Sequence, residues 1–460
     1  MSEHELESRE AGSVSHENGF AGHGDDDALH TGGSMPPTDR GRGAYVALAC
    51  CTLAQVPIWG YSVSYGIFQD YYTSRSGIKG SSGSFATIGT SQMGIMYLIM
   101  PVIFLMLRRY PHLRQWCGPL GLSMTVISLV ASAFVNTVGG LIATQGVLYA
   151  IGCGLLFSPM SMYMDEWFTE RKGMAYGVMW SGKAAVGVAM PFIFSQLLER
   201  FGLKATLLSW TIASAILTCP LLFFLKPRVP LSRSSQPRPI SFEFLRHTPF
   251  WMMQIGIAVQ ALGYIMPSTY MASYASNIGL SSSTGPILVA LFSLASIPGA
   301  IVHGILGDRL SATGVILISS LGSAVPVFAL WGLSRHVANM IVFVLAYGFF
   351  AGGFSSTWSS MCREIQRDDS SSDTAVIFGM LLGGRGLGFV LGGPVSGALT
   401  SAWGALSEET LGYATKYGPM ILFTGITAIF GAWAPFCKLL RSLSSQSLSS
   451  CLSTACSRHP

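Results

Sequence analysis

Charged side chains are scarce in this sequence of 460 residues, because Asp, Glu, Lys and Arg together make up only 11% of it. A soluble globular protein carries roughly 25% charged residues, so the composition excludes an ordinary cytosolic enzyme. Half of the residues are hydrophobic, and the mean hydropathy is +0.48. The apolar residues form continuous runs instead of alternating with polar ones, which disfavours an outer-membrane β-barrel. We therefore expect an all-α protein that crosses a membrane several times.

Sequence patterns for catalysis and for cofactors are also lacking. The nine cysteines show no CxxC spacing, which excludes the usual zinc sites and a disulfide framework. No phosphate-binding loop, nucleophile elbow or His-Glu metal pattern occurs, and no basic stripe with interleaved aromatics is present. The glycine-rich run at 383–388 lies inside an apolar stretch, where it favours close helix packing over nucleotide binding. We expect no enzymatic activity, no cofactor, no metal and no nucleic-acid partner.

Twelve stretches are long and apolar enough to span a membrane, since about 20 apolar residues cross a hydrocarbon core of about 30 Å. The uncharged stretch 115–164 is too long for one helix, and a turn at Asn136-Thr137 is expected to divide it. The polar stretch 226–248 separates six spans from the next six. The predicted spans are 44–69, 85–107, 116–135, 138–162, 173–198, 205–225, 250–274, 285–306, 314–333, 337–360, 375–400 and 417–437.

Lysine and arginine are distributed unevenly between the segments that join these spans. With the N-terminus in the cytosol, the cytosolic segments hold 19 of them and the external segments six, as the positive-inside rule requires. A miscounted helix would reverse the later half. The polar ends of the chain are unable to bury enough apolar area to fold. We predict a disordered tail at 1–43, a six-helix bundle at 44–225, a linker at 226–248, a second six-helix bundle at 249–437 and a disordered tail at 438–460. Both termini are expected to be cytosolic, and the membrane to be the plasma membrane.

A short motif lies in the predicted loop between the eighth and ninth spans. Residues 304–309 read Gly-Ile-Leu-Gly-Asp-Arg, which resembles the cytoplasmic-loop motif of the major facilitators, Gly-x-x-x-Asp-Arg. We predict a gating role for Gly304, Asp308 and Arg309. The glycine lets helix ends approach, and the acid can pair with a cation or with a helix N-terminus to close the cytosolic side.

The equivalent loop of the first half, at 106–114, contains cations but no acid. Two interpretations stay open for it. Either Arg108 or Arg109 pairs with the Asp165-Glu166 cluster, or these arginines only follow the positive-inside rule.

Three further stretches resemble the monocarboxylate-transporter-like facilitators, particularly their fungal members. The first is the Ser-Tyr-Gly-Ile-Phe-Gln-Asp-Tyr-Tyr sequence at 64–72. The others are the glycine-rich passage 152–182 and the tyrosine- and proline-containing segment 264–274 with Gly279-Leu280. The resemblance covers about residues 44–437. It implies the major facilitator fold of two six-helix bundles and alternating access driven by gradients.

Departures from this family concern the substrate. Its animal members place a lysine in the first span and an Asp/Arg pair in the eighth for lactate and its proton. Here the first span has no lysine, and Ala300 stands where the arginine would fall. The resemblance therefore implies a relative that carries something other than lactate.

Two cations lie about ten residues into predicted spans, close to the middle of the membrane. Lys183 follows Gly177 by six residues, Arg385 follows Gly379 in the same way, and each comes directly after another glycine. A charge at this depth normally faces a wet cavity or an anion, so we predict that both bind substrate. The alternative is that Arg385 bonds backbone carbonyls and Lys183 is neutral or reaches the interface.

Several aromatic residues fall in the spans, and we name Tyr65, Tyr264 and Tyr270 as candidates to line the substrate site. Packing or lipid-facing roles are the alternative for each of them.

These observations predict a secondary active transporter of a small organic anion or metabolite. The resemblance implies a fungal exporter of secondary metabolites. The alternatives are a proton-coupled uptake permease for a nutrient monocarboxylate and, from another class, a membrane nutrient sensor that does not transport. The expected partners are the small-molecule substrate, the lipid bilayer and protons as a coupling ion, and we expect a monomer.

Overall fold

The structure is a computed structural model that describes residues 36–74, 78, 82–229, 239–281, 284–334, 336–368, 372–404, 412–415 and 417–437. Its compact unit begins at Pro37. All regular secondary structure in the described ranges is helical, so the predicted all-α fold is confirmed. Most of the two predicted tails and the middle of the predicted linker, including Ser235, lie outside the described residues.

The helices begin and end close to the predicted span limits, because the runs without charge that predicted the spans also form the helices. The first half contains α1 (Arg42–Leu53), α2 (Gln55–Val63), α3 (Tyr65–Ser74), α4 (Ser82–Arg109), η2 (Pro111–Leu113), α5 (Arg114–Ser132), α6 (Val138–Leu141), η3 (Ile142–Leu148), α7 (Tyr149–Trp167) and α8 (Lys172–Phe224). The second half contains η4 (Glu243–Arg246), α9 (Thr248–Tyr264), α10 (Met266–Asn277), α11 (Thr284–Arg309), α12 (Ala312–Pro326), η5 (Val327–Trp331), α13 (Val337–Gly353), η6 (Phe354–Thr357), α14 (Trp358–Asp368), α15 (Thr374–Gly404), η7 (Gly412–Ala414) and α16 (Gly418–Phe430).

Two of the predicted spans are interrupted shortly before a proline. The first span breaks at Ala54, three residues before Pro57, and the seventh breaks at Ile265, two residues before Pro267. A proline ring clashes with the carbonyl group four residues earlier and lacks an N–H donor, which disrupts the helix at that point. The turn predicted at Asn136-Thr137 is present, since α5 ends at Ser132 and the Thr137 side chain caps α6 by accepting a hydrogen bond from the Gly140 N–H group.

The long element α8 is two helices that fold back on each other at Gly202, where φ is 75° and ψ is 178°. This left-handed conformation favours glycine. Phe194 and Trp210 lie eight residues before and after Gly202, and their ring centroids are 5.1 Å apart. A straight helix would separate these residues by about 24 Å, so the chain reverses its direction at Gly202.

Nine helical stretches of the described chain are long and apolar enough to cross a membrane, and α8 supplies two spans within one of them. The elements α5 and α16 occupy two further predicted positions, but α5 is less apolar and α16 is shorter than a spanning helix. Large apolar side chains such as Phe223 and Ile216 are exposed on the outer helices. Water-facing surfaces rarely carry so many such side chains, which indicates contact with lipid. The chain is therefore a multi-pass membrane protein, whereas the count of twelve spans stays a prediction.

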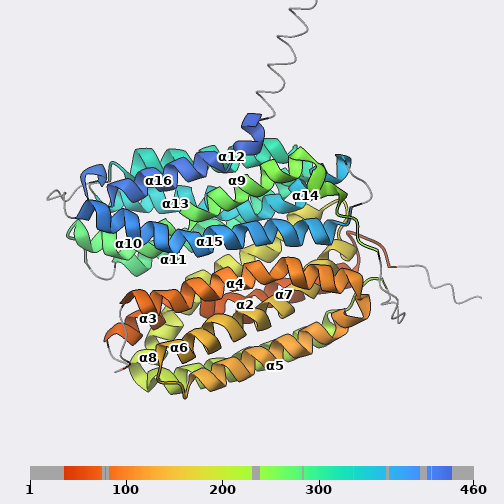
Figure 1. The fold of residues 1–460 in the computed structure, drawn as a ribbon, viewed down its shortest axis with the longest axis horizontal. Helices are drawn as coiled ribbons and strands as arrows, with labels where there is room; N and C mark the ends of the chain where they lie inside the picture. The colour runs from red at the N-terminus through yellow and green to blue at the C-terminus, as the bar shows by residue number, and fades with distance from the viewer. Residues whose placement is uncertain are drawn as a thin grey trace, which may run out of the picture. The chain divides into compact units, whose positions relative to one another are not determined.

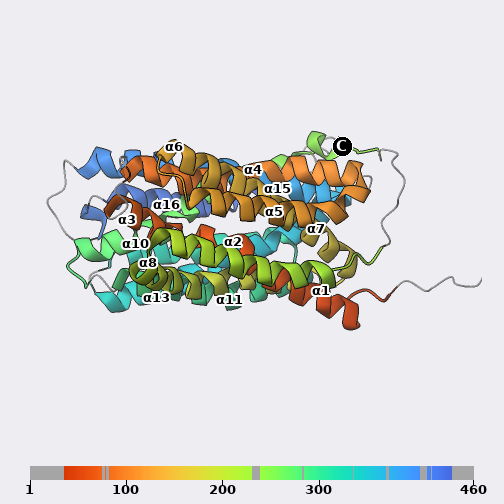
Figure 2. The same cartoon turned by 90° about the horizontal axis from the view of Figure 1, so that it is seen from below.

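Two helix pairs join the halves of the chain. Figure 1 shows α4 lying along α15, and Figure 2 shows α8 lying beside α11. Both pairs pack closely over much of their length. Three of these four helices, α4, α8 and α15, contribute residues to the candidate site.

Candidate functional site

Lys183 lies on α8 beneath three aromatic rings of the first half. Its ammonium nitrogen is 3.7 Å from the ring centroid of Trp59, 5.5 Å from that of Trp180 and 5.9 Å from that of Tyr97. The ammonium also donates a long hydrogen bond of 3.5 Å to the Tyr97 hydroxyl. A cation within about 6 Å of a ring face is attracted by the ring quadrupole. These rings therefore stabilise the half-buried charge of Lys183.

Arg385 lies on α15 beneath three aromatic rings of the second half, and its side chain is 1% exposed. The guanidinium carbon is 4.5 Å from the ring centroid of Tyr264, 5.0 Å from that of Phe389 and 5.3 Å from that of Trp358. Its Nη1 donates a hydrogen bond of 3.1 Å to the Gln260 side-chain carbonyl. The two cations are therefore held in the same way, each by rings of its own half.

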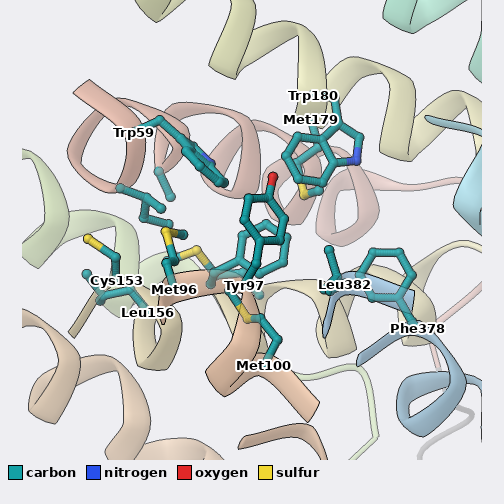
Figure 3. Close-up of a cluster of buried hydrophobic side chains, with 14 of the residues drawn as sticks. Trp59, Met96, Tyr97, Met100, Cys153, Leu156, Met179, Trp180, Phe378 and Leu382 are labelled. Atoms are coloured by element: carbon teal, nitrogen blue, oxygen red, sulfur yellow. The ribbon is translucent and has the colours of Figure 1, made fainter. Parts of the chain in front are cut away.

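The two cations are neighbours. The Tyr97 hydroxyl interacts with both of them, and their charges are close enough to repel each other. Two aromatic pairs also join the rings around Lys183 to the rings around Arg385, across the boundary of the halves. The centroid distances are 5.4 Å for Tyr97–Phe389 and 5.5 Å for Trp180–Trp358. Figure 3 shows the Tyr97 ring between those of Trp59 and Trp180. We call the six rings of Trp59, Tyr97, Trp180, Tyr264, Trp358 and Phe389 the aromatic belt.

The repeated glycines before each cation have matching packing roles. Gly182 lies against the Thr52 carbonyl group of α1, and Gly384 lies against the Gln254 side chain of α9. A side chain at either glycine would collide with these neighbours. The glycines thus let α8 and α15 approach the first helices of their own halves, which brings the cation that follows each one under the rings.

No carboxylate neutralises the pair within the described part of the chain. The ion pairs found there include neither Lys183 nor Arg385. Two neighbouring cations without a counter-charge are costly in a low-dielectric interior. An anion bound between them would remove that cost, so the arrangement is suited to anionic ligands.

The three predicted tyrosines lie in different places. Tyr264 contacts Arg385, as described above. The Tyr65 hydroxyl donates a hydrogen bond of 2.6 Å to the Phe85 carbonyl, and the Tyr270 hydroxyl donates one of 3.0 Å to Ser396 Oγ. The first bond lies within the first half and the second bond within the second half, both away from the belt. Substrate contact by Tyr65 and Tyr270 stays a prediction.

Asp308 joins the two halves at the end of α11 that is predicted to be cytosolic. Its two carboxylate oxygens accept hydrogen bonds of 2.7 Å from the backbone N–H groups of Gly173 and Met174, in the first turn of α8. Arg363 of α14 donates to the same carboxylate at 3.1 Å. The acid therefore contacts both of the partners that the motif predicted, a cation and a helix N-terminus.

Gly304 lies where α11 touches α8. A side-chain carbon at Gly304 would collide with the carbonyl oxygen of Gly173, and one at Gly173 would lie 2.7 Å from the Asp308 carboxylate. The two glycines therefore permit the backbone approach on which the Asp308 bonds depend. Arg309 is exposed and makes no polar contact with the described residues, so its predicted gating role has no structural partner there.

An ion pair also joins the halves, between the end of α4 and the start of α15. Arg108 Nε lies 2.6 Å from Asp373 Oδ2. Neither interpretation of the first-half loop named this pair. The Asp165-Glu166 cluster has other partners, because Lys172 binds Asp165 at 2.7 Å and Arg114 binds Glu166 at 2.6 Å.

A second carboxylate holds the segment before α8. Asp39 accepts hydrogen bonds from the backbone N–H groups of Thr169, Glu170 and Arg171, and one of 2.7 Å from the Thr169 hydroxyl. Burial raises the pKa of the Asp39 carboxyl, but these bonds together lower it further, so that it lies below its usual value of 3.8. Asp39 is therefore an anchor for the start of α1.

Sequence reasoning missed Tyr97, Phe389 and Arg363. Phe389 lies four residues after Arg385 on the same helix, and this spacing places the two side chains together. The contact between Phe389 and Arg385 could therefore have been predicted from the sequence. Tyr97 and Arg363 come from other helices, and no spacing in the sequence connects them to the cations or to Asp308.

Comparison with known proteins agrees with this architecture. The sequence profile of the Major Facilitator Superfamily matches residues 46–288 and 255–449. Similar curated proteins include the MFS-type transporter pynF of Aspergillus niger, which is 25% identical over 80% of this chain and 84% of its own. The MFS-type transporter hasB of Aspergillus fumigatus is 26% identical over 86% of this chain and 88% of its own. The agnestins efflux protein AgnL12 of Paecilomyces divaricatus is 24% identical over 87% of this chain and 88% of its own.

Among solved structures, the human organic anion transporter MFSD10 superposes with a TM-score of 0.58 at 14% sequence identity. The match covers 85% of this chain and 98% of that protein. At this identity it supports the fold alone.

Proposed function

The chain belongs to the major facilitator superfamily of membrane transporters, and from this premise we propose that it exports a small organic anion, a metabolite of a fungal cell, by alternating access. The observation that carries the proposal is the pair Lys183 and Arg385, which meet at the boundary of the halves without a carboxylate among the described residues. An anion between them would contact both halves at once. The agnestins efflux protein supports the direction by its name.

Within the superfamily, we infer a place among the monocarboxylate-transporter-like facilitators, from the resemblance at 64–72 and 264–274. The missing lysine in the first span and Ala300 in the eighth argue against lactate as substrate. Lys183 and Arg385 would take over the role of the substrate anchor, with Tyr264 beside them.

Alternating access requires that contacts between the halves close one side of the site. We propose that the Asp308 bonds to α8 and the Arg108–Asp373 pair close the cytosolic side. Both contacts join helices of different halves near helix ends. They would have to break when the substrate enters from the cytosol.

The proposal is tested by transport into and out of vesicles that contain the purified protein, with benzoate, salicylate, lactate and succinate as labelled anions. Arg385→Met and Lys183→Met should each reduce transport of a carried anion by tenfold or more. The reason is that losing one desolvated bond to a charged group costs on the order of 1.5–3 kcal/mol. Arg385→Lys should restore only part, since lysine lacks the planar fork of arginine.

Lys204→Met serves as the matched control, because Lys204 also lies over an aromatic ring, that of Phe134, but on the exposed surface outside the belt. Its transport should equal that of the wild type. If Arg385→Met and Lys183→Met transport normally while Lys204→Met is also normal, the two cations are structural and the substrate site lies elsewhere.

A further inference from the structure

We propose that the substrate is a planar, conjugated organic anion with at least two oxygen acceptors, such as an aromatic hydroxycarboxylate, bound between the aromatic belt and the two cations. This inference rests on the proposed function and adds the shape and the polarity of the molecule carried.

Hydrogen-bond donors without partners surround the cations. The Nε of Arg385 and the indole Nε1 atoms of Trp180 and Trp358 are buried and have no hydrogen-bond partner in the described part of the protein. Their side chains are 1%, 3% and 0% exposed. Buried polar groups normally find a partner, and an indole N–H or a guanidinium can only donate. A ligand that satisfies these groups must supply acceptors.

The number and placement of these donors call for more than one acceptor atom. Arg385 Nε and the Trp358 indole belong to the second half, whereas Lys183 and the Trp180 indole belong to the first half. A single carboxylate next to a hydroxyl or carbonyl oxygen presents two or three acceptors along one edge. Such an edge can reach donors from both halves together.

The belt determines the shape of the rest of the ligand. In the structure the two cations lie on the rings of the belt, which compensate part of their charge. An anion that draws the cations away from the rings leaves aromatic faces uncovered. Aromatic rings prefer to stack with, or stand edge-on to, other rings, so a flat conjugated ligand covers these faces better than a saturated one.

The cross-boundary pairs explain how such a ligand would be coupled to movement. Tyr97–Phe389 and Trp180–Trp358 are ring contacts between the halves. A flat ring placed between the partners of either pair touches both halves. The ligand therefore replaces contacts that hold the halves together and does not simply fill a hole.

The experiment compares two probes that differ only in the ring. Salicylate and trans-2-hydroxycyclohexanecarboxylate carry the same carboxylate and neighbouring hydroxyl, but only salicylate is flat and conjugated. Binding to the purified wild-type protein in detergent is measured by isothermal titration calorimetry. We expect salicylate to bind at least tenfold more tightly than its saturated counterpart.

Variants separate the ring from the charge. Trp358→Phe keeps a ring and removes one unpaired donor, and it should weaken salicylate binding by about tenfold, as expected for one bond to a charged group. Trp180→Phe is the second variant, should Trp358→Phe not give a monodisperse protein. The matched control is Trp331→Phe, because Trp331 is 0% exposed and also has an unpaired indole N–H, but it lies over Phe343 within the second half. That variant should bind salicylate like the wild type.

Two results would overturn this inference and leave the proposed function standing. One is that the wild type binds both probes with equal affinity and that Arg385→Met binds neither. The other is a Trp331→Phe variant as weak as Trp358→Phe. Failure of salicylate to bind the wild-type protein also contradicts the inference. If Arg385→Met binds both probes with unchanged affinity, the anion site itself is wrong, and the proposed function fails together with the inference.

Discussion

Asp308 offers the most direct test of how the halves are held together. Its carboxylate accepts two backbone N–H groups of α8 at 2.7 Å and one bond from Arg363 at 3.1 Å. Replacement by Asn keeps the size of the side chain and removes its charge. The remaining carbonyl oxygen can hold only one of the two N–H groups in the present geometry, since the NH₂ group is a donor. We expect Asp308→Asn to open this side of the protein more often.

The magnitude follows from the contacts that are lost. One hydrogen bond to a charged group contributes about 1.5–3 kcal/mol, and a charge at a helix N-terminus contributes about 0.3–1 kcal/mol. The Arg363 ion pair lies within the second half and that side chain is 34% exposed, so its loss changes the contact between the halves little. Because these terms overlap, we expect a total of about 2–3 kcal/mol. At about 1.4 kcal/mol for each factor of ten, the open population should rise roughly 30- to 140-fold.

Cys362 is a native cysteine that can report this opening, so no cysteine has to be introduced. The thiol is 0% exposed and lies near Lys172, Asp165 and Arg363, at the contact between the halves. Its alkylation by N-ethylmaleimide, followed by peptide mass spectrometry, should accelerate in Asp308→Asn in proportion to the open population. Cys153, which is 0% exposed in the first-half core, should react at an unchanged rate and serves as the internal standard.

Arg309→Gln is the matched variant, because it removes the neighbouring charge, which is exposed and makes no polar contact with the described residues. Its Cys362 should react as slowly as that of the wild type. A change of less than threefold in Asp308→Asn, at normal expression, would refute the claim that this carboxylate holds the side closed.

Three further predictions concern other parts of the chain. In a double-mutant cycle of Arg108→Ala and Asp373→Ala, the same alkylation assay should give a coupling free energy of about 0.5–1 kcal/mol between the two side chains, because they are 29% and 24% exposed. Strict additivity of the two substitutions would show that the pair does not hold the halves together. Asp39→Asn should speed hydrogen exchange of the amides at 169–171 by about tenfold, the effect of one lost capping bond. Hydrogen bonds keep the pKa of Asp39 below 3.8, so the wild type should keep its amide protection at 169–171 from pH 7 to pH 5 and lose it only as the pH falls below 3.8. Loss of protection already between pH 7 and pH 5 would contradict the role of the Asp39 carboxylate. A cysteine at Ser235 should resist a membrane-impermeant maleimide in intact cells, and ready labelling would disprove a cytosolic linker.

The helices were predictable because charge is excluded from the hydrocarbon core, which makes the limits of uncharged runs close to the limits of the spans. Breaks inside the spans were harder to predict. Pro57 and Pro267 follow interruptions, whereas Pro101 and Pro159 lie inside unbroken helices. Neighbouring helices and polar side chains can satisfy the backbone groups that a proline frees, so the outcome depends on packing that a single sequence does not display.

The candidate site was predictable in its charges and not in its surroundings. Lys183 and Arg385 are conspicuous in apolar runs, and the matching glycines before them indicated equivalent positions. Their contact with each other through Tyr97 depends on which helices of the two halves meet. The same holds for Asp308, whose chemistry predicted an N-terminus or a cation as partner but could not single out Gly173 or Arg363. Arg108 forms an ion pair with Asp373 of the other half, and no local sequence pattern connects these two residues.

The reversal of the chain at Gly202 bears on how the protein enters the membrane during synthesis. A cation at the middle of the bilayer costs at least about 2.5–3.5 kcal/mol on insertion scales, and Lys183 lies on the first limb of this hairpin. The second limb contains no charged residue at 205–225 and ten Leu, Ile and Phe residues, which favour insertion by about 3–6 kcal/mol together. Because a single glycine joins the two limbs, we expect them to pass from the translocon into lipid as one unit. The apolar limb therefore offsets the insertion cost of the charged one, and the tight turn allows Lys183, which we propose as a substrate anchor, to reach the middle of the membrane.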